Sequence, residues 1–197
     1  GEDRGLQGPG LKPKDYALEF YSLDGNDVRH CWSPHQDCEI VYWERTTWVG
    51  PCLQGAIPHG LGLITEPDDS TYDGEFRHGL RHGHGRYESV DGLVYEGAWA
   101  HGMRHGNGFQ TLVDEQQQRF WYASYTGAWV EDMRQGQGEM VLVQGAVYRG
   151  QFSNNLRHGT GNLTEKNGCV YFGEWDKDER HGQCELCVYP DGTRYSG

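Results

Sequence analysis

Residues 148–161 read YRGQFSNNLRHGTG, and the same order of residue types returns along the C-terminal two-thirds of the chain. With the opening tyrosine as position 1, each copy has Gly at position 3, Phe or Trp at position 5, Arg at position 10 and Gly at position 12. The opening tyrosines are Tyr72, Tyr95, Tyr125, Tyr148 and Tyr171. A fixed period of 23 residues, lengthened once to 30 before Tyr125, predicts a repeat protein whose units stack on their neighbours.

Each unit has the pattern of a β-hairpin. Tyr95, Gly97 and Trp99 occupy alternate positions, so both rings point to one face of a short strand, where they can cover the bare glycine between them. The cluster Gly102–Gly106 is suited to a tight turn, and a second strand follows it, for example Glu139–Val143. Favoured turn pairs such as Asp91-Gly92 then precede the next tyrosine.

Hairpins joined by equally short turns can only lie beside one another. The expected fold class is therefore all-β: an elongated, single-layer, twisted antiparallel meander of hairpins with a short β N-terminal cap. No window of 12 residues shows the apolar spacing of an amphipathic helix, which excludes a helical solenoid.

The repeat also divides the chain into segments. We expect a flexible lead-in at 1–14, a β cap at 15–47 with strands such as Tyr16–Ser22, Val28–Ser33 and Glu39–Glu44, and a degenerate copy at 48–71. Five repeats and the start of a sixth follow at 72–197, with an insertion near 113–122. The cap is placed to cover a sheet edge that would otherwise be exposed.

Composition narrows the function classes. The chain of 197 residues has a formal net charge of -12, which gives little affinity for nucleic acid or anionic lipid. It has no apolar signal peptide at its start and no apolar run long enough for a membrane span. Its six cysteines are irregularly spaced, so we expect reduced thiols and a cytoplasmic protein.

The order Tyr-x-Gly-x-Trp/Phe followed by Gly-x-x-His-Gly-x-Gly resembles the MORN (membrane occupation and recognition nexus) repeat over residues 72–197, with 48–71 a weaker copy. Departures are Asp132, Asn155 and Asp178 for Gly at position 8, Gln135 for His at position 11, and Cys184 for the final Gly. Asn and Asp tolerate left-handed backbone, so the turn should survive. The resemblance implies a scaffold used in membrane contacts, lipid kinases, methyltransferases, radial spokes and cytoskeletal rings, with any chemistry in other domains.

Two rows of side chains are candidate protein-binding surfaces. One row consists of the arginines at position 10, which would bind acidic tails or phosphate groups. The alternative is that those arginines are solvated or paired with acids such as Glu75, Glu131 and Glu174. The other row consists of the aromatic rings, which would bind an amphipathic helix or an extended peptide. The alternative is that the rings chiefly stabilise the sheet. The candidate residues are Arg81, Arg104, Arg134, Arg157, Arg180, Tyr72, Phe76, Tyr95, Trp99, Tyr125, Trp129, Tyr148, Phe152, Tyr171 and Trp175.

Metal and catalytic sites are not expected, and neither is a cofactor. The histidines at position 11 (His59, His82, His105, His158 and His181) recur too far apart to share a metal ion, so we interpret them as turn residues. Residues three apart in a strand face opposite sides, so Cys184 and Cys187 should not form a site. His30, Cys31, His35 and Cys38 form the densest Cys/His cluster, and we favour ordinary thiols there over zinc. No catalytic motif is present.

The leading hypothesis is a non-catalytic scaffold for protein–protein interaction in a cytoskeletal or ciliary assembly. Its partner would be a helix, an extended peptide or an acidic tail. One alternative is a module that binds anionic phospholipid and apposes membranes, and another is the regulatory region of a larger enzyme. Nucleic acid is not expected as a partner, whereas open sheet edges allow a homo-oligomer.

Overall fold

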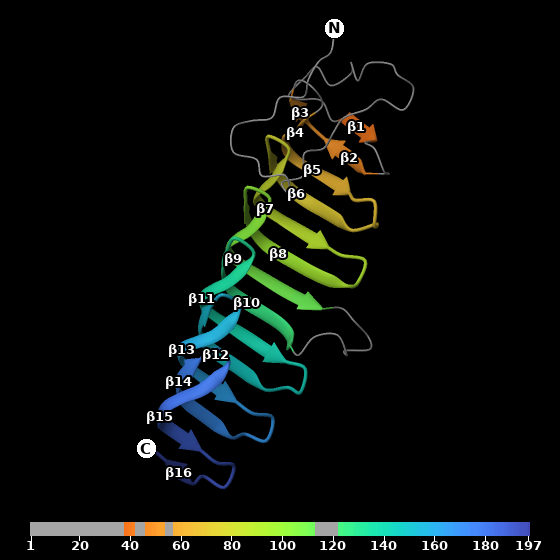
Figure 1. Cartoon of the computed structure of the whole chain (residues 1–197). Coiled ribbons are helices and arrows are strands. Elements are labelled where there is room, and N and C mark those ends of the chain that lie inside the picture. The colour runs from red at the N-terminus through yellow and green to blue at the C-terminus, as the bar shows by residue number, and fades with distance from the viewer. Residues whose placement is uncertain (1–37, 42–45, 54–56, 113–121) are drawn as a thin grey trace. The chain divides into compact units, whose positions relative to one another are not determined.

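The computed structural model describes residues 38–41, 46–53, 57–112 and 122–197. Every regular element in these ranges is a β-strand (Figure 1). The described residues form two compact units. One unit contains those up to Asp91 together with Ala98–Met103, and the other contains Gly92–Gly97 and Arg104–Gly197, so the division falls within strand β8 (Leu93–Ala100).

The first unit is an antiparallel sheet in the order β1 (Cys38–Val41), β2 (Thr47–Gly50), β5 (Gly60–Thr65), β6 (Thr71–Arg77) and β7 (Leu80–Glu88). Between β2 and β5, β3 (Cys52–Leu53) pairs with β4 (Ile57–Pro58) in a small separate sheet. Strand β1 overlaps the strand expected at 39–44. The strands expected at 16–22 and 28–33 lie outside the described residues.

The second unit continues the same topology. Its strands are β9 (Met103–Leu112), β10 (Tyr122–Val130), β11 (Met133–Leu142), β12 (Val147–Ser153), β13 (Leu156–Thr164), β14 (Val170–Asp176), β15 (Glu179–Val188) and β16 (Arg194–Tyr195). Each pairs antiparallel with the next. The prediction of an all-β antiparallel meander of consecutive hairpins is therefore confirmed. Most of the expected insertion lies outside the described residues.

The turn of each hairpin lies at positions 7 and 8, where both residues have positive φ, as in the two-residue turns that match strand twist. In the third repeat they are Glu131 (φ 49°) and Asp132 (φ 67°). Asn155 and Asp178 adopt the same conformation, each at φ 71°, which confirms that Asn and Asp serve at position 8. The prediction that Gly102–Gly106 forms the turn was wrong beyond Gly102, because β9 already begins at Met103.

The Arg-His-Gly segment is instead a bulge inside the second strand. Gly74 pairs with Gly85, but its neighbour Glu75 pairs with His82, so two residues of β7 lie outside the register. Gly83 takes φ 59° there, and an oxygen of Glu75 accepts the backbone N–H of His84 at 3.0 Å. A glycine with positive φ lets the strand continue beyond such a bulge.

Candidate binding surface

The aromatic rings at positions 1 and 5 are buried within the fold. The five opening tyrosines and their position-5 partners are all at most 6 % exposed. The rings of Tyr72, Tyr95, Tyr125 and Tyr148 each lie against a cross-strand pair of glycines. A Cβ built on Gly85 would be 2.3 Å from the Tyr72 ring, and one on Gly161 would be 2.3 Å from the Tyr148 hydroxyl. Glycine at these places therefore provides the surface that the ring covers.

The tyrosine hydroxyls are satisfied by backbone. Tyr72, Tyr125, Tyr148 and Tyr171 each donate to the carbonyl oxygen three residues later, at 2.9–3.1 Å. Burial raises the pKa of Tyr125 to about 12 and raises the pKa of Tyr72, Tyr95 and Tyr148 as well. These phenols therefore remain neutral hydrogen-bond donors at any physiological pH.

Successive rings meet edge to face, which joins each repeat to the next. In the first unit Phe76 contacts both Trp48 and Tyr72, with centroids 4.6 and 5.0 Å apart. In the second unit the contacts run without a break at 5.0–5.5 Å. That series is Tyr95, Trp129, Tyr125, Phe152, Tyr148, Trp175 and Tyr171. Each such pair contributes about 0.5–1.5 kcal/mol beyond its buried area.

The position-10 arginines cover these rings. The guanidinium carbon of Arg104 lies 4.4 Å from the Trp129 centroid, and that of Arg157 lies 4.4 Å from Trp175. Arg134 is buried and lies over Tyr122 at 4.7 Å, and burial lowers its pKa. Arg81 lies over Tyr87 and Arg180 over Tyr171, at 4.8 and 4.7 Å. The arginines thus pack on the rings as cations.

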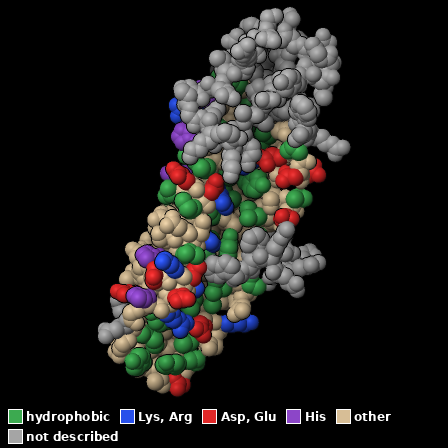
Figure 2. All heavy atoms as spheres, in the orientation of Figure 1, with side chains coloured by type: hydrophobic (Ala, Val, Ile, Leu, Met, Phe, Trp, Pro, Cys, Tyr) green, Lys and Arg blue, Asp and Glu red, His purple; other side chains and the backbone are tan. Residues whose placement is uncertain are grey.

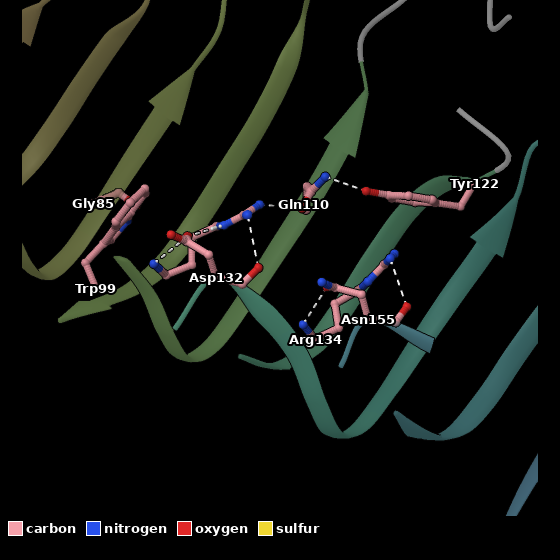
Figure 3. A network of polar contacts seen from close by, with 8 residues as sticks. Gly85, Trp99, Gln110, Tyr122, Asp132, Arg134 and Asn155 are labelled. Atoms are coloured by element: carbon pink, nitrogen blue, oxygen red, sulfur yellow. Dashed lines mark hydrogen bonds and ion pairs between the residues drawn. The ribbon is translucent and has the colours of Figure 1, made fainter. Parts of the chain in front are cut away.

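Three of the arginines also clamp the next repeat through its position 8, and Figure 3 shows the clamps at Asp132 and Asn155. An oxygen of Asp132 accepts both the backbone N–H and the Nε–H of Arg104, at 3.0 and 2.8 Å, and Arg104 Nη2 donates to the Asp132 carbonyl at 3.1 Å. Asp178 binds Arg157 in the same three ways. Asn155 accepts from the backbone N–H of Arg134, and its carbonyl accepts from Arg134 Nη2.

The clamp was missed by sequence reasoning, which paired the arginines with acids at positions 4 and 7. Arg81 and Arg180 follow a third arrangement and bind Glu66 and Glu165, each in the turn before its own repeat. The Arg104 clamp extends into a buried network, in which Arg104 Nη1 donates to Gln110 Oε1 at 2.9 Å and Gln110 Nε2 donates to the Tyr122 hydroxyl at 2.6 Å (Figure 3).

Two of the position-11 residues, His59 and Gln135, are acceptors for the next turn. The backbone N–H of His78 donates to His59 Nδ1 at 3.4 Å, and that of Asn154 donates to Gln135 Oε1 at 3.0 Å. Gln135 can therefore replace histidine here because both supply an acceptor. Desolvation, followed by the charges of Arg77 and His101, lowers the pKa of His82.

The face opposite the rings carries side chains that change from strand to strand. One cross-strand row of the second unit runs through Phe109, Thr126, Glu139, Arg149, Asn162, Phe172 and Leu186. Phe109 is 41 % exposed, and Phe172 and Leu186 are each 38 % exposed. In Figure 2, hydrophobic side chains near the C-terminal end lie among charged ones. This row presents apolar groups to solvent.

A family model described as MORN repeat matches residues 72–94, 95–116, 125–147, 148–170 and 171–194. The chain belongs to the MORN repeat family. No curated protein matches the chain. Among solved structures, it is similar to the TCP domain of SAS-4 (dCPAP) of Drosophila melanogaster, in complex with a proline-rich motif of Ana2 (dSTIL). That match has a TM-score of 0.45 and 8% identity, and it covers 82% of this chain and 88% of that chain.

The fifth MORN repeat contains a disulfide, which corrects the expectation of reduced thiols. Cys184 is bonded to Cys187, and Cys52 is also disulfide-bonded, whereas Cys169 is free. Cys184 pairs with Gly173 and Cys187 with Tyr171, so one residue between them lies outside the register. That extra residue puts both cysteines on the same face of the strand, which plain alternation would not.

The described parts of the MORN chain were also compared with the expectations for metal sites and membrane-spanning segments. There, no group of three or more His, Cys, Asp or Glu is placed to hold a metal ion, and there is no helix of the length and hydropathy needed to cross a membrane. The Cys/His cluster expected at 30–38 lies outside the described residues apart from Cys38. Within each unit the candidate residues lie on one face of the sheet, and their role in partner binding stays a prediction.

Proposed function

We propose that this MORN chain is a non-catalytic scaffold that binds a protein partner, in a cytoskeletal or ciliary assembly. The family indicates a repeat module of the kind found in protein and lipid interactions. The cytoskeletal or ciliary assignment rests on the settings in which such repeats occur. Repeat scaffolds keep a constant interior and vary the surface that meets a partner.

The observation that carries the proposal is the exposed apolar end of the row opposite the rings. Phe172 on β14 pairs with Leu186 on β15, and Val170 pairs with Val188 one step along the same face. Exposed, contiguous apolar side chains rimmed by charge are typical of protein-binding surfaces. The rings and the position-10 arginines, in contrast, are engaged within the fold, so a partner meeting them would have to displace intramolecular contacts.

No observation favours the lipid alternative to the same degree. Arg81, Arg104 and Arg157 each bind a carboxylate, with side chains 11%, 22% and 14% exposed. A phosphate group would have to compete with those carboxylates. The net charge of -12 adds repulsion from an anionic surface.

The test is affinity purification of the full chain from ciliated cells with chemical cross-linking, in three forms: wild type, Phe172→Ser with Leu186→Ser, and Leu61→Ser. Leu61 is the matched control, since it is 70% exposed in the first unit. We expect protein partners cross-linked to β14 and β15 to be lost from the double variant and retained by the control. Recovery of membrane without a protein partner, or equal recovery by all three forms, would contradict the proposal.

A further inference from the structure

The fifth repeat is one residue longer than the fourth, and strand β15 contains the extra residue. Tyr195 follows Tyr171 after 24 residues, whereas Tyr171 follows Tyr148 after 23. The loop after β15 is closed by a hydrogen bond from the N–H of Tyr189 to the carbonyl of Thr193, which spans four residues like the equivalent bond after β13. The two loops are therefore equal in length, and the added residue lies within β15, after position 14.

Position 16 shows the effect of this residue. In the second, third and fourth repeats the side chain at position 16 is buried: these residues are Gln110, Met140 and Leu163. Leu163 pairs with Tyr148, the opening tyrosine of its repeat. In the fifth repeat Tyr171 pairs instead with Cys187 at position 17, and Leu186 at position 16 is exposed on the opposite face. A leucine in a place that is buried elsewhere thus faces solvent.

The disulfide requires this register. Cys184 at position 14 and Cys187 both lie on the ring face, because residue 185 lies outside the register with β14. In the regular register of the fourth repeat, residues three apart face opposite sides, so the two sulfur atoms could not meet. A shift of one residue moves every side chain to the other face of a sheet. The bond and the outward Leu186 therefore occur together.

A second register is open to β15 once the bond is broken. The extra residue can move into the loop, which then has four residues instead of three, and both lengths are common in hairpins. Leu186 would then pair with Tyr171, as Leu163 pairs with Tyr148. Burial of leucine is favourable, and leucine fills the place beside the tyrosine better than the smaller Cys187 does. We expect the reduced chain to prefer this register.

We propose that the Cys184–Cys187 bond is a redox switch of the docking surface. Reduction by a soluble dithiol lets β15 shift by one residue and buries Leu186, whereas oxidation exposes Leu186 to the partner. The inference rests on the proposed function, because Leu186 and Phe172 form the apolar pair that the partner meets. Disulfides of cytosolic proteins are usually transient or redox-sensing, which fits a cytoskeletal setting.

The reduction is a two-electron exchange between the disulfide and the dithiol. A thiolate of the reductant attacks the Sγ of one cysteine, forms a mixed disulfide and releases the other cysteine as a thiolate, which takes up a proton. The second thiol of the reductant then displaces the first cysteine, so the products are two cysteine thiols and a cyclic disulfide of the reductant. Cys184 and Cys187 are both partly exposed, so a small dithiol can reach the bond.

The experiment follows the leucine methyl groups of the purified full chain by NMR, with a soluble paramagnetic agent, before and after dithiothreitol. In the oxidised chain Leu186 should be broadened as strongly as Leu156, which is equally exposed in the same unit. After reduction we expect the broadening of Leu186 to fall to that of buried Leu163, while Leu156 is unchanged. Unchanged broadening of Leu186 after reduction would overturn the proposal.

Cysteine variants separate this bond from the other thiols of the chain, since dithiothreitol also reduces the disulfide of Cys52. The double variant Cys184→Ala with Cys187→Ala should protect Leu186 in oxidising buffer, without any reductant. Cys169→Ala is the matched control because Cys169 is a free thiol in the same repeat array, and it should still respond to dithiothreitol. An exposed Leu186 in the double variant, or a control that no longer responds, would refute the switch.

Two single-residue deletions test the shift itself, because each restores the period of 23 on a different side of Leu186. Deletion of Glu185 removes the residue outside the register, so Leu186 should stay exposed with or without dithiothreitol. Deletion of Pro190 shortens the segment after β15 instead, so Leu186 should be buried in both buffers. Loss of Leu186 exposure on reduction of the Glu185 deletion would show that a shift of β15 is not the cause.

The outcomes separate this inference from the proposed function. The NMR experiment needs only the purified chain, whereas the cross-linking experiment needs a partner from cells. A Leu186 that stays exposed after reduction overturns the switch and leaves the partner at Phe172 and Leu186 to its own test. Absence of any protein partner in cells, with the NMR response present, overturns the scaffold instead.

Discussion

Single residues in this repeat serve two roles at once. Asp132 supports a turn at φ 67° and binds Arg104 of the repeat before it with its side chain. Gly138 lets β11 approach β10 and provides the surface under the Tyr125 ring, where a Cβ would be 2.5 Å from ring carbon Cε2. Because one residue serves two neighbouring parts of the repeat, a substitution here should lower the unfolding free energy by more than the size of the change suggests.

The close ring contact gives the first prediction. Gly138→Ala should lower the unfolding free energy by about 2–3 kcal/mol, because the added methyl overlaps a fully buried ring. Urea unfolding of the wild type and of Gly138→Ala measures this difference in unfolding free energy. The control is a double-mutant cycle: in a Tyr125→Ala background the same methyl should cost under half as much. Equal costs in both backgrounds would show that the ring is not the cause.

The clamp gives the second prediction. Asp132→Ala should lower the unfolding free energy by about 2 kcal/mol, since it removes the carboxylate that accepts from the backbone N–H and Nε–H of Arg104 and puts alanine at positive φ. Asp132→Asn should cost less than half of that, because Asn155 already performs both roles beside Arg134. Chemical denaturation compares the two variants. Similar losses in both would contradict the clamp.

At the scale of the element, each hairpin joins a two-residue turn to a bulge four to five residues later. The bulge at Gly83 is braced by Glu75, and the turn at His78 is braced by His59 from the preceding copy. His59 and Gln135 at position 11 thus connect a strand to the following turn. The stability of the hairpins should therefore depend on the protonation of two kinds of histidine. One kind accepts a hydrogen bond, as His59 does, and the other is desolvated, as His82 is.

The pH dependence follows from His82. Its pKa is lowered in the folded chain by desolvation, then by Arg77 and His101, with Glu75 acting in the opposite direction. The folded state therefore prefers neutral His82, so its contribution to stability is present above about pH 6.5 and is lost as the pH falls below that value. Urea unfolding at pH 7.5 and 5.5 should show a decline that is smaller in His82→Gln. An identical decline in unfolding free energy in the wild type and in His82→Gln would show that His82 does not contribute to the pH dependence of stability.

The hairpins could be predicted from sequence because their signals are local. Tyr, Gly and Trp alternate within five residues, and Gly145, Gly168 and Gly192 all take the positive φ that their turn pairs predict. The clamp could not be predicted from sequence, because Asp132 lies 28 residues after Arg104 and Asp178 lies 21 residues after Arg157. The Cys184–Cys187 bond was missed because a single extra residue reverses the alternation of β15, and no composition signal marks it.

At the scale of the whole molecule, stability should be distributed along the chain. In the second unit each MORN repeat contacts the next through a ring pair and an arginine. In such arrangements stability is close to a sum of repeat and interface terms. Loss of one end should then weaken the chain gradually.

Removal of residues 171–197 tests that expectation. The shortened chain should remain folded, and its urea m-value should fall roughly in proportion to the surface no longer buried. Near-ultraviolet circular dichroism and urea titration provide the measurement. A shortened chain that is unfolded in buffer would show that the repeats act as one cooperative whole.

The edge-to-face contacts have an optical consequence. Tyr148 and Tyr171 each lie within 5.5 Å of Trp175, and Tyr95 and Tyr125 lie within 5.4 Å of Trp129. At such separations an excited phenol passes its energy to the indole before it can emit. Emission from these four tyrosines should therefore be very weak in the native chain and should reappear wherever neighbouring repeats separate, so the protein carries its own fluorescent reporter of local opening.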